Sequence, residues 1–258
     1  MFTKQKYHIA TLTILLKEVI RFKRIWLQTI IPPVITTSLY FIIFGNLVGS
    51  KIGTMGGVHY IQYIVPGLVM MSVIQNAYAN VSASFFSAKF QKSIEELLVA
   101  PIPNYLIILG YISGGIVRGI IVGFLVLLTA LCFTPMPIHH PGLMLLMTVL
   151  SASLFSLAGL LNGIYAKKFD DISVIPTFIL TPLTYLGGVF YSTSMLPPFW
   201  RTLSLANPIV HIVDTFRYGM LGVADVNIRS AIIVTSCFTA LLFTTCLYLL
   251  NRGIGLRT

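Results

Sequence analysis

Polar side chains that could act on a solute stand at helical spacing in two apolar stretches, residues 60–87 and 172–191. In the first stretch they are Ser72, Asn76, Asn80 and Ser84. In the second they are Ser173, Thr177, Thr181 and Thr184. Steps of about four residues put each set on one helix face. An unpaired asparagine amide in hydrocarbon is costly, so these faces predict a translocation path, a subunit interface or close packing between helices.

A second group that could do chemistry is His211, Asp214, Arg217 and Tyr218, which would share one face of a helix. Such residues could serve a catalytic triad or a metal, but a self-satisfied charge cluster explains the same spacing. His139 and His140 lie between prolines and indicate a turn. The sequence contains no phosphate loop, His-Glu-x-x-His, Gly-x-Ser-x-Gly or dinucleotide fingerprint. We therefore predict no catalytic residue, no metal site and no cofactor bound by this chain.

The composition indicates a protein that crosses a membrane several times. Of 258 residues, 56% are hydrophobic and only 9% are charged. The net charge of +10 would also suit a nucleic-acid partner, but the positions of the basic residues explain it as membrane topology. The three cysteines all fall in apolar runs without paired spacing and are predicted to be buried thiols.

Six apolar runs are long enough to cross the hydrocarbon core, which needs about 20 residues. They are residues 25–48, 60–87, 104–133, 141–166, 172–191 and 230–250. Residues 1–24 precede them and predict an amphipathic helix at the membrane interface, with basic residues that can reach anionic lipid head groups. Of the 17 Lys and Arg, 12 lie on one side of these spans and four on the other. The positive-inside rule then places both termini in the cytoplasm.

The charged segment 88–104 interrupts the apolar runs after the second span. Ser93 and Glu96 fit a capping box, and Pro101 follows as a stop signal. The apolar positions Ile94, Leu97 and Leu98 would share one face of a helix over 93–100. A helix this short is marginal alone, so its apolar face must be covered by lipid, by this chain or by a partner protein, and we favour the partner.

Three further features concern the packing of the spans. Glycines at four-residue steps in 104–133 and 141–166 predict close contacts between helices. Arg118 falls near the middle of the third span and needs a partner, which the sequence does not identify. Residues 192–227 are apolar but broken by prolines, and predict short outer helices that re-enter the membrane before the last span.

This pattern resembles the ABC-2 type permease family, the membrane subunits of ATP-binding cassette exporters, over essentially the whole chain. The segments that carry the resemblance are Phe41–Gly45, Tyr63–Gly67, Ile94–Pro101, Phe169–Ile172, Pro182–Phe190, Asn207–Pro208 and Phe216–Gly219. The implied fold is an all-α membrane protein, like the type V exporters, in which residues 1–258 form one transmembrane domain of six spans. The resemblance also implies a location in the cell inner membrane.

The resemblance implies functional roles for three sets of residues. The helix over 93–100 would be the coupling helix, docked on a cytosolic ATPase through Ser93, Ile94, Glu95, Glu96, Leu97, Leu98 and Pro101. The stripes of the second and fifth spans would line the central path or the dimer interface through Ser72, Asn76, Asn80, Ser84, Thr177, Thr181 and Thr184. An outer gate would include Asn207, Pro208 and Arg217.

The implied partners are two copies of a cytosolic ABC ATPase, which would bind the ATP and magnesium, and a second copy of this permease. Membrane lipids would surround the assembly, and no nucleic acid is expected. The expected function is export of a polysaccharide, lipid, drug or peptide. The alternatives are an ion-coupled secondary carrier and an intramembrane enzyme that uses His211 and Asp214.

Overall fold

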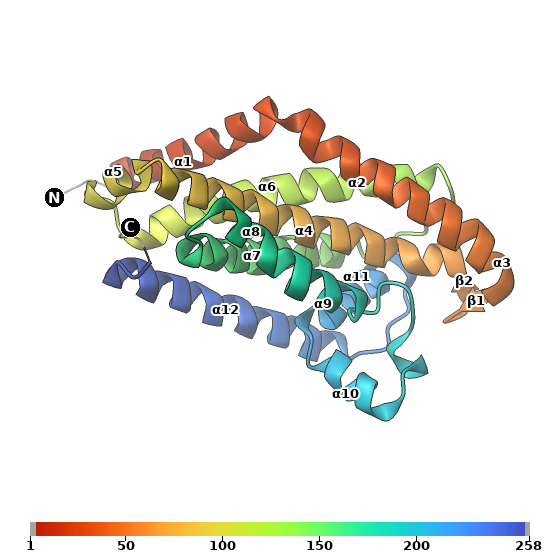
Figure 1. The fold of residues 1–258 in the computed structure, drawn as a ribbon. Coiled ribbons are helices and arrows are strands. Elements are labelled where there is room, and N and C mark those ends of the chain that lie inside the picture. Colours follow the sequence, from red (N-terminus) through yellow and green to blue (C-terminus); the bar gives the residue numbers. More distant parts are fainter. Residues whose placement is uncertain (1–3, 256–258) are drawn as a thin grey trace.

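The computed structural model describes residues 4–255, which form a bundle of long helices with short elements at both ends (Figure 1). The elements of the first half are α1 (Lys4–Arg24), α2 (Trp26–Tyr40), the π-helix η1 (Phe41–Val48), α3 (Gly49–Ile52), β1 (Thr54–Met55), β2 (Val58–His59), α4 (Tyr60–Phe90) and α5 (Ser93–Val99). Those of the second half are α6 (Asn104–Leu131), α7 (Pro141–Tyr165), α8 (Phe169–Ile175), the π-helix η2 (Pro176–Leu180), α9 (Thr181–Tyr185), the 3-10 helix η3 (Thr193–Met195), α10 (Pro198–Leu205), α11 (Pro208–Leu221) and α12 (Ile228–Arg252).

Five helical stretches within the described residues are long and apolar enough to cross a membrane. They are Trp26–Ile52, Tyr60–Phe90, Asn104–Leu131, Pro141–Tyr165 and Ile228–Arg252. The predicted runs 60–87, 104–133, 141–166 and 230–250 therefore each correspond to one helix, and the run 25–48 corresponds to α2, η1 and α3 together. Because α4 has 31 residues, at about 1.5 Å each it exceeds a hydrocarbon core of roughly 30 Å.

The predicted fifth span, 172–191, is built differently from the other five. Its helical part consists of α8, η2 and α9, with seven, five and five residues, and Leu186 ends the helix. Pro176 and Pro182 each remove a backbone N–H from this segment, which accompanies the change from α- to π-helix. At its start, the amides of Lys167 and Lys168 donate to Asp171 and hold the pKa of that carboxyl below its usual value.

Helix α4 forms the centre of the bundle. In an apolar stretch of 18 residues of α4, 89% of the residues are buried. The corresponding share is 12% in Trp26–Ile52 and 17% in α12. Gly159 of α7 packs so closely on α4 that a Cβ there would lie 2.4 Å from the Tyr78 carbonyl oxygen. In α6, Gly115 and Gly119 lie against side chains of both α4 and α7, and Gly123 lies against Val73 of α4. The prediction that the glycines mediate helix packing is confirmed.

The two ends of the bundle differ in character. The start of α1, the end of α12 and helix α5 lie at one end, and the β1–β2 hairpin and α10 lie toward the other (Figure 1). The hairpin pairs Thr54 with His59 and turns through Gly56 and Gly57, whose φ angles of 61° and 83° favour glycine. Two of the three cysteines, Cys132 and Cys237, are exposed on the chain, so the prediction of buried thiols is right only for Cys246.

Candidate functional site

Helix α5 connects the C-terminal end of α4 to the start of α6, at the bundle end that holds the start of α1 (Figure 1). Lys92 precedes it in a left-handed conformation, with φ 59° and ψ 5°. The hydroxyl of Ser93 donates to the carbonyl of Ala88, 3.2 Å away, and no side chain caps the helix. The predicted capping box between Ser93 and Glu96 is therefore wrong, because Ser93 is already the first helical residue.

The apolar face of α5 packs on its own chain. Ile94 is 1% exposed within a cluster that includes Phe85, Ile107 and Leu160, and Leu97 and Leu98 pack partly against the same cluster. The exposed residues of α5 are Glu95, Glu96 and Val99, and Pro101 is exposed just beyond it. The expectation that Ile94 binds a partner protein is thus corrected. The exposed surface of α5 carries two carboxylates and Val99, which is 85% exposed.

Lys89 fixes the same end of α4 to α7. Its Nζ donates to the carbonyls of Ile164 and Ala166, at 2.7 and 2.8 Å. These carbonyls lie at the C-terminus of α7, where a cation also interacts favourably with the helix dipole. The end of α4 that carries α5 is therefore tied to a neighbouring span.

The second half of α1 packs along α6, and the two helices run in the same direction. Ile14 lies against Gly110 and Glu18 against Gly114, where an added Cβ would approach each side chain to 2.6 Å. Ile14, Glu18 and Phe22 are buried, whereas Leu12, Leu16 and Ile20 are exposed. The second half of α1, which was predicted to be interfacial, therefore packs one face on the bundle and exposes a second, apolar face.

The buried face of α1 carries a polar network that reaches α4, formed by Glu18, Arg21, Asn80 and Ser84. Arg21 donates from Nη2 to Glu18 Oε2 at 3.0 Å. Asn80 donates to the same carboxylate at 3.3 Å, and the hydroxyl of Ser84 donates to Glu18 Oε1. Glu18 is 1% exposed, and both of its carboxylate oxygens accept hydrogen bonds from side chains of this chain. Asn80 and Ser84 therefore join helices within one chain.

Arg118 of α6 finds its partner in Asn76. The Nε and Nη2 of Arg118 donate to Asn76 Oδ1 at 3.3 and 3.0 Å, and the amide nitrogen of Asn76 donates to the carbonyl of Ser72. Asn76 and Ser72 also line a small groove of about 170 Å³ between α2 and α4, together with Thr36, Thr37 and Gln75. Of the polar stripe on α4, Ser72 and Asn76 are thus the residues that open on a polar groove.

The second stripe bonds to its own helix. Thr181 donates to the carbonyl of Pro176 at 2.8 Å, and Thr184 donates to that of Thr181 at 2.7 Å. Ser173 likewise donates to Asp170. Thr177 is exposed and Thr184 is buried, because the π-turn and the prolines rotate these positions relative to an ideal helix. The four hydroxyls therefore do not form one continuous face.

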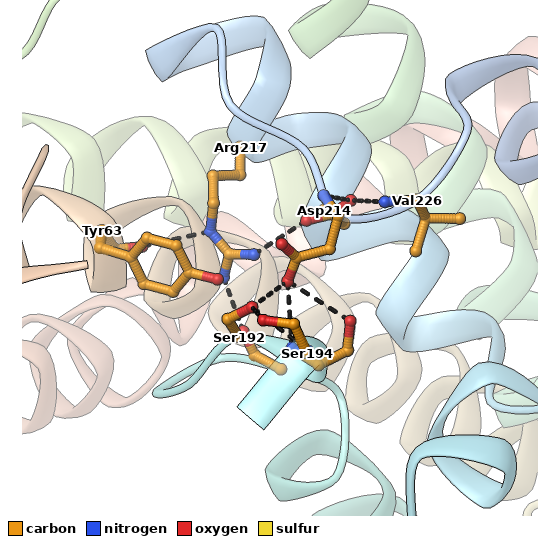
Figure 2. A network of polar contacts seen from close by, with 9 residues as sticks. Tyr63, Ser192, Ser194, Asp214, Arg217 and Val226 are labelled. Atoms are coloured by element: carbon orange, nitrogen blue, oxygen red, sulfur yellow. Dashed lines mark hydrogen bonds and ion pairs between the residues drawn. The ribbon is translucent and has the colours of Figure 1, made fainter. Parts of the chain in front are cut away.

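At the opposite end, Arg217 is the centre of a second buried network (Figure 2). Its guanidinium donates to Asp214 Oδ1 at 3.1 Å, to the Gly188 carbonyl at 2.6 Å and to the Tyr63 carbonyl at 3.3 Å. It also stacks over the Tyr63 ring, 4.0 Å from the centroid. Arg217 is 2% exposed and thus joins α11 to α4 and to the loop after α9.

The carboxylates around Arg217 organise the loop that precedes α12. Asp214 Oδ2 accepts from the amides of Asp225 and Val226, each at 2.7 Å. Asp225 in turn accepts from the hydroxyl of Ser192 and from the amide of Thr193. Figure 2 shows these groups converging from α11, the Ser192 loop and the chain near Val226. The network holds the short outer elements in one arrangement.

The residues predicted for an outer gate lie at the start and in the middle of α11. Asn207 caps the helix by accepting from the amide of Ile209 at 3.0 Å, and its side chain donates to the Leu183 carbonyl at 2.7 Å. Pro208 takes the first helical position, where it suits a helix. These residues therefore attach α11 to α9, and Arg217 attaches it to α4.

The histidines make local contacts. His211 Nε2 lies 2.9 Å from the Leu205 carbonyl oxygen, whereas the hydrogen bonds of Asp214 are with Arg217, Asp225 and Val226. His140 stacks on Tyr218. Among residues 4–255, no three histidine, cysteine or acidic side chains stand close enough together to hold a metal.

Comparison with known proteins identifies the family. The family model of the ABC-2 type transporter matches residues 9–221. The chain belongs to the ABC-2 type transporter family. It is 58% identical to the inner membrane transport permease YadH of Escherichia coli K12 over 252 residues, which cover 98% of each chain. It is also 24% identical to nodulation protein J of Sinorhizobium fredii NGR234, over 84% of this chain and 83% of that protein.

Membership of the ABC-2 type transporter family bears on the alternatives that the sequence left open. A family of transport permeases favours a non-enzymatic membrane subunit over an enzyme built on His211 and Asp214. In this ABC-2 type transporter, sequence reasoning missed Glu18, Lys89 and Asp225 as network residues. For Glu18 the available signal was its type, because the chain has only seven acidic residues and a carboxylate on a membrane-facing helix needs a partner.

Proposed function

We propose that the chain is the permease half of an ABC exporter of the inner membrane, with both termini in the cytoplasm. The observation that supports this most is the construction of α5. Its apolar side is anchored by Ile94, its acidic side is free, and it joins two spans. The excess of basic residues at the same end favours a cytoplasmic location.

In this proposal α5 receives the movement of a separate ATPase. Because Ile94 packs among residues of α4, α6 and α7, a displacement of α5 is transmitted to those spans. Lys89 extends the transmission to the end of α7. Two ATPase subunits, which bind ATP and magnesium, would act on two copies of the permease.

The path for the exported substrate would lie between the two permease copies. Ser72 and Asn76 open on the groove between α2 and α4, and the segment α8–η2–α9 exposes Val174, Phe178 and Ile179 outside the chain. We assign the groove to the path and the exposed face to contact with lipid or the second copy. The exported substrate would be a polysaccharide, a lipid, a drug or a peptide.

The ATPase contact is tested by photocrosslinking in native membranes. A photoreactive phenylalanine analogue at Val99 should crosslink to a protein that carries a phosphate loop and lacks membrane spans. The same analogue at Phe199, which is 71% exposed at the opposite end, is the matched control and should give no such product. Equal ATPase capture at both positions, or none at Val99, would reject α5 as the docking element.

The path is tested in the reconstituted complex. Tryptophan at Ser72 or Asn76, which both line the groove, should lower substrate-stimulated ATP hydrolysis while the ATPase remains bound. Unchanged stimulation in both variants would contradict the assignment of the path. Transport that collapses with an uncoupler but persists without ATP would instead identify an ion-driven carrier.

A further inference from the structure

A basic groove lies beside the bundle between α1, the last turns of α4 and the start of α5. It has a volume of about 580 Å³. Its charged lining residues are Lys17, Arg21 and Arg24, and none of its lining residues is acidic. Ser84, Ser87, Gln91 and Ser93 add polar groups from α4 and the turn into α5. The groove therefore offers positive charge from α1 and hydrogen-bonding groups from α4, the turn and the start of α5.

Much of this charge is not neutralised by the chain. Arg21 pairs with Glu18, but its Nε is buried without a hydrogen-bond partner. Within residues 4–255 no ion pair involves Lys17 or Arg24, and both side chains are exposed. An anion in the groove would offset the positive charges of Lys17 and Arg24.

The groove is also lined by apolar side chains, which a free inorganic anion would leave uncovered and a lipid could cover. Leu16 and Ile20 line it and are 50% and 57% exposed. Trp26, 52% exposed, follows the last basic residues of α1 as the first residue of α2, and tryptophans of this kind sit at the level of lipid head groups. From Thr13 to Arg24 the groove extends about 16 Å along α1. A ligand of this shape is amphipathic.

We propose that this groove binds the phosphate head group of an anionic lipid from the adjoining leaflet, with an acyl chain along Leu16 and Ile20. Lys17 and Arg24 bind the phosphate from two turns of α1, Ser87 donates from α4, and Gln91 donates from the turn that follows α4. The bound lipid bridges α1 to the turn that begins α5. This site goes beyond the proposed function and does not depend on it, because it concerns lipid binding by the permease itself.

The test measures lipid binding to the purified full-length chain by native mass spectrometry and by titration in a neutral detergent. The probes are phosphatidylglycerol, phosphatidylcholine, glycerol phosphate and inorganic phosphate. Lys17→Gln and Arg24→Gln should each weaken phosphatidylglycerol binding roughly fivefold. Lys23→Gln is the matched control, because Lys23 is an exposed neighbour of Arg24 that does not line the groove, and it should change binding less than twofold.

Each other outcome rejects the proposal in a distinct way. Equal losses in all three variants would mean diffuse attraction to basic residues. Equal binding of phosphatidylcholine would remove the requirement for an anionic head group, and equal binding of inorganic phosphate or glycerol phosphate would remove the lipid. If phosphatidylglycerol does not bind but Arg24→Gln releases the ATPase, the groove binds an acidic protein segment and not a lipid. Unfolding temperatures close to wild type establish that the variants are folded.

Discussion

The Nη2 of Arg21 donates to both the side-chain Oδ1 and the main-chain carbonyl of Asn80, each at 2.9 Å. One arginine of α1 therefore recognises one residue of α4 through two acceptors, across 59 positions of sequence. Because Glu18 accepts from Arg21 and Asn80 as well, α1 is joined to the central helix by a closed set of polar contacts. Movement of α4 should therefore be accompanied by movement of α1.

Glu18→Ala should destabilise the protein by about 2 kcal/mol, measured as the free energy of unfolding in detergent. Removing one member of a buried ion pair costs roughly 3–5 kcal/mol, and the 28% exposure of Arg21 reduces that figure. Glu95→Ala is the control, since Glu95 is exposed on α5, and should have little effect. Similar losses in the two variants would mean that the Glu18 network adds no stability.

Ile94→Ala should destabilise the protein by roughly 2–4 kcal/mol, because it leaves a cavity in the cluster that holds α5. Val99→Ala, on the exposed side of the same helix, should leave unfolding unchanged within about 0.5 kcal/mol. Val99→Asp should instead weaken ATPase binding. A stable Ile94→Ala variant that loses the ATPase would restore the apolar face as the docking surface.

Gly159→Ala should destabilise by about 1–3 kcal/mol, since the new methyl group would lie 2.4 Å from a backbone oxygen of α4. Gly142→Ala provides the control near the start of α7, where nothing lies within 4 Å of the added carbon. Chemical unfolding of both variants measures the difference. If the two substitutions behave alike, the contact between α4 and α7 is not close-packed in solution.

Arg217→Lys should cost about 2–4 kcal/mol, because an ammonium group cannot reproduce the planar contacts with Asp214, Gly188 and Tyr63. Arg201→Lys, an exposed position on α10, should be silent. Limited proteolysis of the segment 186–227 gives a second measurement, since loss of the network should speed cleavage there. An unaltered cleavage rate would contradict the organising role of Arg217.

A double-mutant cycle between Asn76→Ala and Arg118→Met should give a coupling energy of about 1–3 kcal/mol. The two hydrogen bonds from Arg118 end on a single oxygen of Asn76, so removal of either partner removes both bonds. Unfolding of the two single variants and the double variant measures the coupling. Additive effects would show that Arg118 finds its compensation elsewhere.

The positions of the spans could be read from the sequence because apolar length and proline breaks are local signals. The predicted run 60–87 corresponds to Tyr60–Phe90, and 141–166 to Pro141–Tyr165. The π-turn at Pro176–Leu180 could not be read, because four-residue spacing assumes an ideal α-helix. The polar stripes of 60–87 and 172–191 therefore looked equivalent in sequence but differ in structure.

The polar networks could be predicted only in part, because their members are distant in sequence. Asn76 and Asn80 were recognised as needing partners, but Arg118 and Glu18 are 42 and 62 positions away from them. The apolar spacing of Ile94, Leu97 and Leu98 was also correct. That spacing did not reveal that the apolar face of α5 packs on other helices of the same chain. A face buried within its own chain and a face buried by a partner protein have the same sequence pattern.

Lys89 also bears on how the protein is made. Its acceptor at Ile164 is 75 positions later in the chain, so α4 leaves the ribosome well before α7 exists. Until then its acceptors at Ile164 and Ala166 do not exist, and the turn into α5 lacks its tie to α7. The bond between Lys89 and Ile164 therefore closes only after the fourth apolar run has been inserted. Formation of this contact therefore completes the bundle end that carries α5.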